Sequence, residues 1–469
     1  MKNKQNRILS DCLYEIFEYL DKNTLYSCLL VNHLWCEVSV RNLWRSIRNC
    51  KTLIACLPNE SKEILYNNGI IISNSTSKPP LFNYVTFIKN ISVYNIEGII
   101  KYILQNYQNY QSITPQSLNH KEYIVAEEIY KLIMNQISLK ELYFISYSIT
   151  IDIPNINFIS YPGARDCLKC LSKLNIRSDL YPEFFYQLSK LCYNIQYLEI
   201  KFVEVISNGV TDLISVQKNL KSLIIQSCNC EDLMGVIHSL TKLPNTLIKF
   251  ELYGGGHSIP LSFITNLTNL QELVLSFYIY GDSFGYFKKI HHITFPQLQI
   301  LKFPFGHPEI ETLIKFLEIN GKNLKEFRIS SPDNSLYLVI DKFCPNLRKL
   351  FTIEIKEVEL LKKIFNGCQY LESIKILCGD NYKEVLETVV KYSPKNFYEL
   401  KMVINTRSEI LSKELEKFFT IWKDRIPQKS LSFTIEGNNF NDSEMNYEII
   451  EVIKKYKRLG IIKKFKVIM

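Results

Sequence analysis

Apolar residues recur along most of the chain in one short pattern, in which three apolar positions are separated first by two variable residues and then by one. Neighbouring copies start 23 to 28 residues apart. The pattern occurs in succession at Leu171/Leu174/Ile176, Ile195/Leu198/Ile200, Leu220/Leu223/Ile225, Leu247/Phe250/Leu252, Leu270/Leu273/Leu275, Leu298/Leu301/Phe303, Leu324/Phe327/Ile329, Leu347/Leu350/Thr352, Leu371/Ile374/Ile376 and Phe397/Leu400/Met402. Looser copies lie at Ile88/Ile91/Val93, Leu139/Leu142/Phe144, Leu431/Phe433/Ile435 and Ile462/Phe465/Val467. Such regularity predicts a repeat of short strands.

Between these triples, apolar residues recur at the three- and four-residue spacing of helices that bury one side. The clearest such stretches are 309–319, 357–365, 382–392 and 413–422. One strand and one helix cannot bury their apolar sides alone, so neighbouring units must stack. The period lies in the leucine-rich-repeat range. The sequence therefore predicts an α/β solenoid with a curved parallel sheet inside and helices outside.

Two details of the repeat carry further expectations. Thr352 occupies an apolar position and, with Ile353 beside it, predicts a local irregularity. An asparagine stands directly before the first apolar residue in six copies, where its tolerance of turn conformations would help the chain enter a strand. These residues are Asn194, Asn219, Asn269, Asn323, Asn346 and Asn396.

The first 48 residues do not follow the repeat and predict three short helices, at 11–20, 24–31 and about 34–47. Asp11, after Ser10, is placed to cap the first helix or to complement its dipole. One side of that helix is apolar, and Trp35 and Trp44 follow later in the segment. This is more apolar surface than so small a bundle can easily bury, so we expect a partner to cover it.

The order and spacing of residues from Leu9 to Arg45 resemble those of the F-box family. The chain departs from the usual family pattern at Ser10, where a proline normally follows the first leucine. Combined with the repeats, the whole chain resembles an F-box leucine-rich-repeat protein. The matching residues are Leu9, Cys12, Leu13, Tyr14, Glu15, Ile16, Phe17, Tyr19, Leu20, Leu25, Cys28, Val31, Asn32, Trp35, Leu43, Trp44 and Arg45.

The resemblance implies particular partners. F-box proteins dock through this bundle onto a Skp-type linker, which joins them to the cullin and RING subunits of a ubiquitin ligase, while the second domain holds the substrate. By position, the docking surface or its support would comprise Leu9, Leu13, Ile16, Leu20, Leu25, Val31 and Trp35. The alternative is that these residues pack a helical cap for the solenoid, since terminal repeats need covering.

The expected domains follow from this division of the chain. They are an F-box docking domain at 1–48, a linker at 49–82 and a leucine-rich-repeat domain at 83–469, with the clearest repeats at 168–405. The expected function is a substrate-recognition adaptor. A leucine-rich-repeat scaffold that binds a protein ligand without any ubiquitin ligase is the alternative.

One column of strand residues predicts a substrate-binding surface. Side chains alternate along a strand, so the residue after the second apolar position faces away from the core, and neighbouring strands lie about 4.8 Å apart. We expect an acidic or phosphorylated protein segment to bind there, unless nearby acids such as Glu326 and Glu399 neutralise the column. Its later half places cations around an aromatic residue, at Lys302, Arg328, Phe351, Lys375 and Lys401.

The motifs for catalysis and for metal or nucleotide binding are incomplete. Residues 281–285 fit G-x-S-x-G around Ser283, but a further repeat follows and the later histidines come too soon for a hydrolase triad. Neither Cys167/Cys170 nor Cys228/Cys230 has partners at zinc spacing, and residues 254–256 lack the lysine of a phosphate loop. We predict a protein that is not an enzyme and needs no cofactor or metal. A hydrolase built on Ser283 is the catalytic alternative.

Composition and charge add three expectations. The net charge of +9 is spread over 469 residues, so a nucleic-acid partner is not favoured; the basic run 454–466 is interpreted as the solvated side of a last helix at 447–459. No apolar stretch reaches the roughly 18 residues of a membrane span. Acidic residues interrupt any signal-peptide core near the start. We therefore expect a cytoplasmic or nuclear protein whose 13 cysteines are free thiols.

Overall fold

The computed structural model describes residues 2–47, 50–71, 80–107, 115–145, 157–203, 207–227, 234–254, 260–277, 284–330, 334–354, 358–378, 381–404, 411–426, 429–437 and 447–468. The chain divides into two compact units, Met1–Leu220 and Lys221–Met469. We call them unit 1 and unit 2.

Every predicted triple coincides with a strand. In unit 1 the strands are β1 (Asn90–Ser92), β2 (Glu141–Tyr143), β3 (Lys173–Arg177) and β4 (Tyr197–Phe202). In unit 2 they are β5 (Ser222–Ser227), β6 (Lys249–Gly254), β7 (Glu272–Phe277), β8 (Ile300–Phe303), β9 (Glu326–Ile329), β10 (Lys349–Glu354), β11 (Ser373–Leu377), β12 (Glu399–Val403), β13 (Leu431–Glu436) and β14 (Ile462–Ile468). Within each unit, neighbouring strands pair in parallel and in chain order, which confirms the α/β solenoid.

The register brings equivalent apolar residues side by side. Phe250 pairs with Leu273, and Leu273 with Leu301, and all three side chains are fully buried. The expected irregularity at Thr352 is a shift of register: Phe351 pairs with Lys375, and Ile353, not Thr352, pairs with Ile376. One extra residue in β10 therefore keeps the ladder in phase.

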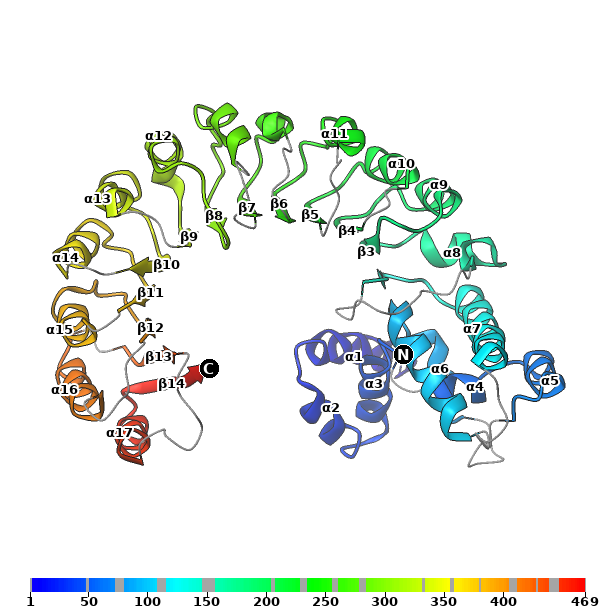
Figure 1. The fold of residues 1–469 in the computed structure, drawn as a ribbon. Coiled ribbons are helices and arrows are strands. Elements are labelled where there is room, and N and C mark those ends of the chain that lie inside the picture. Colours follow the sequence, from blue (N-terminus) through cyan, green and yellow to red (C-terminus); the bar gives the residue numbers. More distant parts are fainter. Residues whose placement is uncertain are drawn as a thin grey trace. The chain divides into compact units, whose positions relative to one another are not determined.

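Helices follow the strands. In unit 2, Figure 1 shows them on the outside of the arc of strands; they are α11 (Met234–Leu240), α12 (Ile310–Asn320), α13 (Asn334–Phe343), α14 (Val358–Gly367), α15 (Tyr382–Tyr392), α16 (Leu411–Lys423) and α17 (Tyr447–Arg458). Short 3₁₀ helices occupy this place after β6 and β7, at η4 (Leu261–Asn266) and η5 (Gly285–Lys289), and η6 (Gly321–Asn323) extends α12. The repeat helices of unit 1 are α6 (Val93–Tyr107), α7 (Pro115–Gln136), η3 (Phe158–Ser160), α8 (Ala164–Leu168), α9 (Pro182–Leu191) and α10 (Gly209–Ser215).

Buried amide side chains join one repeat to the next. Asn320, at the end of α12, accepts a hydrogen bond from the backbone N–H of Phe295 (2.7 Å) and donates to the carbonyl of Ile293 (2.9 Å). In unit 1, Gln217 accepts from the N–H of Ile195 (2.9 Å) and donates to the carbonyl of Cys192 (2.7 Å). These contacts satisfy backbone groups that the turns would otherwise leave buried and unpaired.

The asparagines before the strands also connect repeats, which turn propensity alone did not predict. The amide of Asn219 donates to Asn194 Oδ1 (2.6 Å), and that of Asn346 donates to the carbonyl of Lys322 (2.9 Å). Asn323 donates in the same way to the carbonyl of Pro296 (3.2 Å). Each bond ties one turn to the turn of the preceding repeat.

Three helices form the N-terminal bundle, as predicted, but with different bounds: α1 (Lys2–Phe17), α2 (Lys22–Cys28) and α3 (His33–Leu43). The prediction that Asp11 caps the first helix was wrong, because α1 already begins at Lys2. Ser10 lies inside α1, where a proline would remove a helical hydrogen bond. The observed caps are Asp21, which accepts from the N–H of Asn23 (2.9 Å) and Thr24 (3.1 Å), and Asn32, which accepts from that of Trp35 (2.9 Å).

The segment expected as a linker, 49–82, contains two helices, α4 (Cys50–Ala55) and α5 (Asn59–Asn67). Cys50, Leu53 and Ile54 of α4 are buried. The short helix η1 (Tyr84–Phe87) then leads into β1. Residues 72–79 lie outside the described residues.

Three carboxyl oxygens are buried without hydrogen-bond partners among the described residues where α6 packs against α7. Both oxygens of Glu97 and Oε1 of Glu122 are shielded from solvent and have no partner among the described residues. Burial, and then the charge of Glu122, raise the pKa of Glu97 to about 8. Burial also raises the pKa of Glu122, although the charge of Lys101 acts against it. Burial, and then the charge of Glu97, raise the pKa of Tyr130.

Replacing Asn320 with alanine should destabilise the protein by about 1–3 kcal/mol, because it leaves the buried N–H of Phe295 and the half-buried carbonyl of Ile293 without their partner. Asn323→Ala is the control, since Asn323 makes one exposed bond to the preceding repeat and should cost less than about 0.5 kcal/mol. The measurement is the urea midpoint by circular dichroism. Equal midpoints for the two variants would contradict this role of Asn320.

Stability should fall as the pH rises from about 4.5 to about 8, because folded Glu97 keeps its proton up to about 8 whereas an unfolded glutamate loses it near 4.5. The unfolded state binds fewer protons across this window, so ionisation favours unfolding. Denaturation at several pH values should show that Glu97→Gln loses less stability than wild type over that range. A constant difference between the two proteins at every pH would refute the assignment.

Candidate protein-binding surfaces

The α1–α3 bundle has a small core of its own. Phe17, Leu25, Cys28, Val38 and Leu43 are buried together. The ring of Trp35 meets that of Phe17 edge to face, with centroids 5.1 Å apart. Of the residues that the F-box resemblance assigns to docking, Leu25 is therefore core, and Leu13, Leu20 and Trp35 are half-buried supports packed against it. Leu9 lies in α1, but its side chain is outside the described residues.

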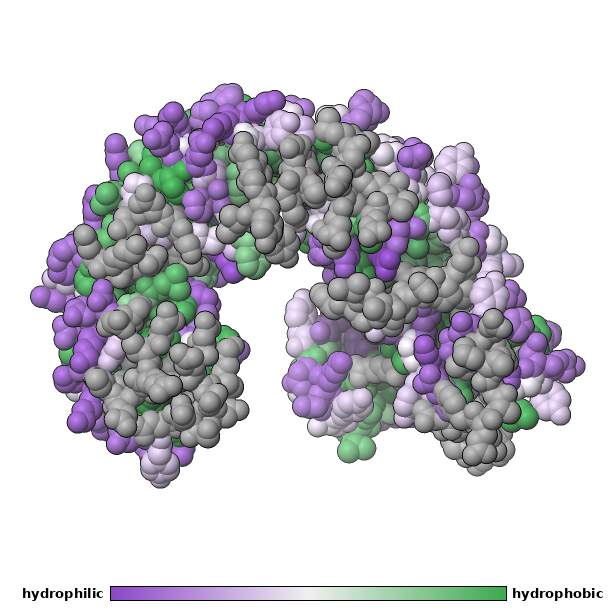
Figure 2. Space-filling model, viewed as in Figure 1, coloured by the Kyte–Doolittle hydropathy of each residue, from purple (hydrophilic) through white to green (hydrophobic). Residues whose placement is uncertain are grey.

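The remaining two assigned residues are exposed. Ile16 at the end of α1 and Val31 after α2 expose 57% and 56% of their surface, and Leu30 and Tyr19 expose 89% each. Figure 2 shows hydrophobic side chains at the lower edge of the bundle. So much exposed apolar surface on about thirty residues is typical of an interaction site. We call Ile16, Tyr19, Leu30 and Val31 the bundle patch.

A different part of the bundle attaches it to the repeats of unit 1. The carbonyl of Arg45 accepts hydrogen bonds from the N–H groups of Lys89 (2.8 Å) and Asn90 (3.0 Å), and Ser46 forms a parallel bridge with Asn90. The ring of Trp44 lies 4.5 Å from that of Tyr84 in η1. The end of the bundle thus covers the edge of β1, while the bundle patch stays exposed.

The predicted column of cations exists as a ladder on the sheet face of unit 2 that the helices do not cover, which we call the inner face. Lys302 pairs in register with Arg328, Arg328 with Phe351, Phe351 with Lys375, and Lys375 with Lys401. The register therefore brings all five residues together, as expected.

Acidic residues of the neighbouring columns neutralise most of these cations. Lys302 forms ion pairs with Glu272 (3.1 Å) and Glu326 (3.0 Å). The chain of pairs continues from Glu272 to Lys249 (3.4 Å) and from Lys249 to Glu251 (2.8 Å). The inner face of β6–β9 is thus a row of alternating charges that pair with one another.

At the later strands the pattern is similar, with one exception. Lys375 pairs with Glu436, and Lys401 pairs with Glu399 (3.3 Å) while lying 5.0 Å from the centroid of the Phe351 ring. Arg328 is exposed and forms no ion pair with any described residue. Of the four predicted cations, Arg328 is therefore the one most available to an acidic ligand.

Sequence reasoning missed two of these acids. It noted Glu326 and Glu399, but Glu272 and Glu436 lie in strands on either side of the predicted cations and pair with Lys302 and Lys375. Their signal is present in the sequence. The residues one place before the second apolar position and one place after the third also face the inner side, so writing out all three columns would have revealed the neutralising charges.

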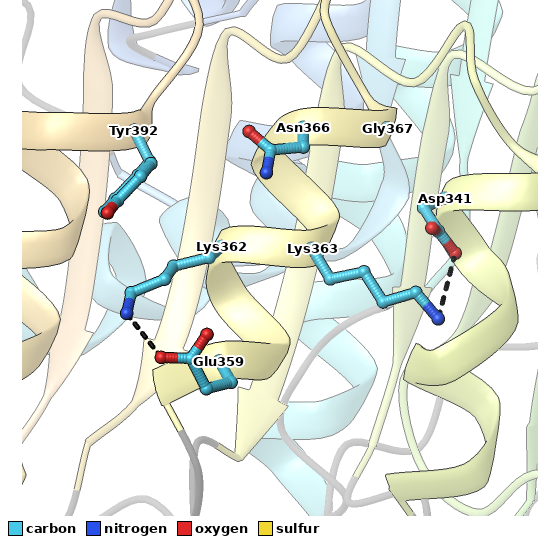
Figure 3. A pocket seen from close by; sticks show the side chains of 7 residues that line it. All are labelled: Asp341, Glu359, Lys362, Lys363, Asn366, Gly367 and Tyr392. Carbon is cyan, nitrogen blue, oxygen red and sulfur yellow. Dashed lines mark hydrogen bonds and ion pairs between the residues drawn. The ribbon is translucent and has the colours of Figure 1, made fainter.

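A shallow pocket of about 440 Å³ lies on the outer helices of unit 2, between α13, α14 and α15. In Figure 3 its two lysines point in opposite directions, Lys362 to Glu359 and Lys363 to Asp341. Lys363 Nζ also donates to the carbonyl of Leu338 (3.0 Å). Because both cations are already paired, the pocket offers little to an anionic ligand.

The other sequence motifs gain no support as catalytic or metal sites. Ser283, Cys228 and Cys230 lie outside the described residues. Cys167 is a buried free thiol whose pKa burial raises to about 12, and Cys170 is exposed. The described residues contain no cluster of three or more side chains that could hold a metal ion. In that same part of the chain, no helix combines the length and apolar character needed to cross a membrane.

Comparison with known proteins finds similarity in structure only. No protein-family profile matches the chain, and no curated protein matches it significantly. A chain of the yeast Rad7–Elc1 complex aligns with 72% of this chain and 98% of its own length, at 14% identity and a TM-score of 0.43. A leucine-rich-repeat protein of Leptospira interrogans aligns over 87% and 98% (13% identity, TM-score 0.30), and a chain of the mouse RP105/MD-1 complex over 81% and 69% (12%, 0.32). Similarities this weak assign no function, and the fold rests on the strand register described above.

The two adjacent cations of the ladder should respond differently to removal. Lys302→Ala leaves the half-buried carboxylates of Glu272 and Glu326 without their shared cation and should cost about 1 kcal/mol, more than an isolated exposed pair. Arg328→Ala breaks no ion pair among the described residues and should change stability by less than about 0.5 kcal/mol. Urea melts at low and high salt measure both. A larger loss for Arg328→Ala would overturn this account of the inner face.

Proposed function

We propose that the protein is a substrate-recognition adaptor of a cullin-RING ubiquitin ligase, with the α1–α3 bundle docking onto a Skp-type linker. The observation that carries the proposal is the bundle patch, an exposed apolar surface on the segment whose residue order resembles the F-box. Ile16 and Val31 are exposed and belong to the positions that the resemblance assigns to docking. Leu13, Leu20, Leu25 and Trp35 support that surface from beneath.

The adaptor itself performs no chemistry in this proposal. The linker, cullin and RING subunits bring the activated ubiquitin, and the repeats hold the substrate so that one of its lysines meets the thioester at high effective concentration. The inner face of unit 2 binds that substrate. Arg328, exposed and in register with Phe351, is the residue most suited to meet an acidic or phosphorylated side chain, and Lys302, Lys375 and Lys401 contribute where the ligand displaces their present partners.

A second candidate is a leucine-rich-repeat scaffold that binds a protein ligand and never meets the ubiquitin machinery. The contact that favours it is the bridge between Ser46 and Asn90. It makes the bundle a cover for the edge of β1, as a solenoid requires of its terminal element. A cap explains this end of the bundle, but it does not explain why the bundle patch is exposed.

Co-purification with a Skp-type linker distinguishes the two candidates. Ile16→Asp with Val31→Asp should reduce linker binding at least about tenfold, since two charges would enter an apolar interface while the bundle core stays intact. The matched control is Ile421→Asp with Leu338→Asp, which alters residues of similar exposure, 53% and 52%, on α16 and α13. Circular dichroism should show that both variants are folded. Wild-type binding by the bundle variant, or none by the wild type, would leave only the scaffold.

Linker co-purification combined with an assay of ubiquitin transfer separates docking from substrate capture. Arg328→Glu should leave the linker bound but reduce ubiquitin transfer to the substrate. Lys315→Glu, which changes an exposed lysine of α12, should alter neither. If a ligase containing the Arg328→Glu variant transfers ubiquitin to the substrate as well as one containing the wild type, the substrate binds elsewhere.

A further inference from the structure

The two ends of the strand ladder differ in how they are finished. In unit 1, β1 has three residues, and its edge is covered by Arg45 and Ser46 of the bundle segment. In unit 2, β14 has seven residues and pairs with β13; within the described residues no strand pairs with its other side. An edge of this length exposes a row of backbone N–H and C=O groups that can pair with another strand.

Five cationic side chains in β14 and at the end of α17 form no ion pair with a described residue. Lys463, Lys464 and Lys466 are exposed, as are Lys457 and Arg458 at the end of α17, and none forms an ion pair with a described residue. One turn earlier in α17, by contrast, Lys454 pairs with Glu451 (3.0 Å) and Lys455 with Glu416 (2.6 Å). The inner-face lysines of β11 and β12 are also paired. The end of α17 and β14 thus bring five cations, unpaired among the described residues, together on one short stretch of the chain.

The apolar side of β14 is also incompletely covered. Phe465 and Val467 are only half-buried, although their partners in register, Phe433 and Ile435, are almost fully buried. Terminal repeats of solenoids normally present a polar outer face. Here the strand presents apolar residues on one face and Lys464 and Lys466 on the other.

We propose that β14 and the end of α17 bind an extended acidic segment of a partner protein, which adds a strand to the edge of the sheet. Acidic residues of this segment, spaced two apart, lie on the same face as Lys464 and Lys466. The residues between them are apolar and cover Phe465 and Val467. Main-chain hydrogen bonds supply affinity and the alternating side chains supply specificity, as in other cases of strand addition.

This surface lies in unit 2 and is independent of the docking proposed for the α1–α3 bundle. A lysine-rich edge can also serve two purposes that involve no peptide. The lysines can act only to prevent edge-to-edge aggregation, or their charge can attract nucleic acid without using the strand edge. The half-buried apolar residues favour a peptide, because a nucleic-acid backbone would leave Phe465 and Val467 uncovered.

Fluorescence anisotropy of the full chain tests the proposal with a labelled nine-residue peptide that alternates glutamate and valine. The comparison probes are a peptide with the same residues in two blocks, the alternating peptide with N-methylated amides along one edge, and a 20-nucleotide single-stranded DNA. We expect the alternating peptide to bind at physiological salt and the blocked and N-methylated peptides to bind at least about tenfold more weakly.

Two variants locate the binding. Lys464→Glu with Lys466→Glu should weaken binding of the alternating peptide by about tenfold or more. Lys395→Glu with Lys413→Glu makes the same change of charge at exposed lysines that also form no ion pair with a described residue, and should have little effect. Circular dichroism confirms that both are folded.

Three results would overturn the proposal. Equal binding of the alternating, blocked and N-methylated peptides would show an unspecific charge effect. Tighter binding of the DNA, with the same sensitivity to Lys464 and Lys466, would make this a nucleic-acid surface. Binding of no probe at concentrations up to about 1 mM would leave the lysines as protection against aggregation.

Discussion

Each repeat of this protein can bury its apolar residues only against its neighbours, and this constraint determines the rest of the structure. In β7, for example, Leu273 is buried because Phe250 and Leu301 lie beside it in register. Stacking also buries backbone groups at the turns, and Asn320 and Gln217 supply hydrogen bonds that those groups need. Apolar burial gives the ladder its stability, and the amides fix how one repeat meets the next.

The same constraint makes the ends of the ladder the informative places. An end strand has a neighbour on one side only, so its free side must be covered, charged or used. The segment around Arg45 and Ser46 covers the edge of β1, and the bundle that it ends also bears the exposed bundle patch. On β14 the free side bears lysines and half-buried apolar residues. Both proposed binding surfaces thus belong to elements that finish a stack rather than to elements within it.

The fold could be predicted from the sequence because the apolar triples recur at nearly constant spacing, and few other architectures produce that pattern. Apolar triples predicted every strand, and Tyr382–Tyr392 matches the predicted helix in both bounds. The bounds of the N-terminal helices and the pairing of the inner-face cations could not be predicted in the same way. Ser10, unlike a proline, is compatible with a helix interior, and α1 begins at Lys2, nine residues before the predicted start. The two helices of the 49–82 segment were not predicted, because helices of six and nine residues contain too few turns to show a clear apolar periodicity. The functional difference between Arg328 and its neighbours depended on ion pairs across strands, which a single column of residues does not contain.

We propose that a Skp-type linker covers the bundle patch, while the repeats remain free to hold another protein. Hydrogen–deuterium exchange of the full chain, with and without saturating linker, measures this protection residue by residue. We expect slower exchange in α1–α3, centred on residues 16–35, and unchanged exchange in β5–β14. Unchanged exchange in the bundle, or protection found only in the repeats, would contradict it.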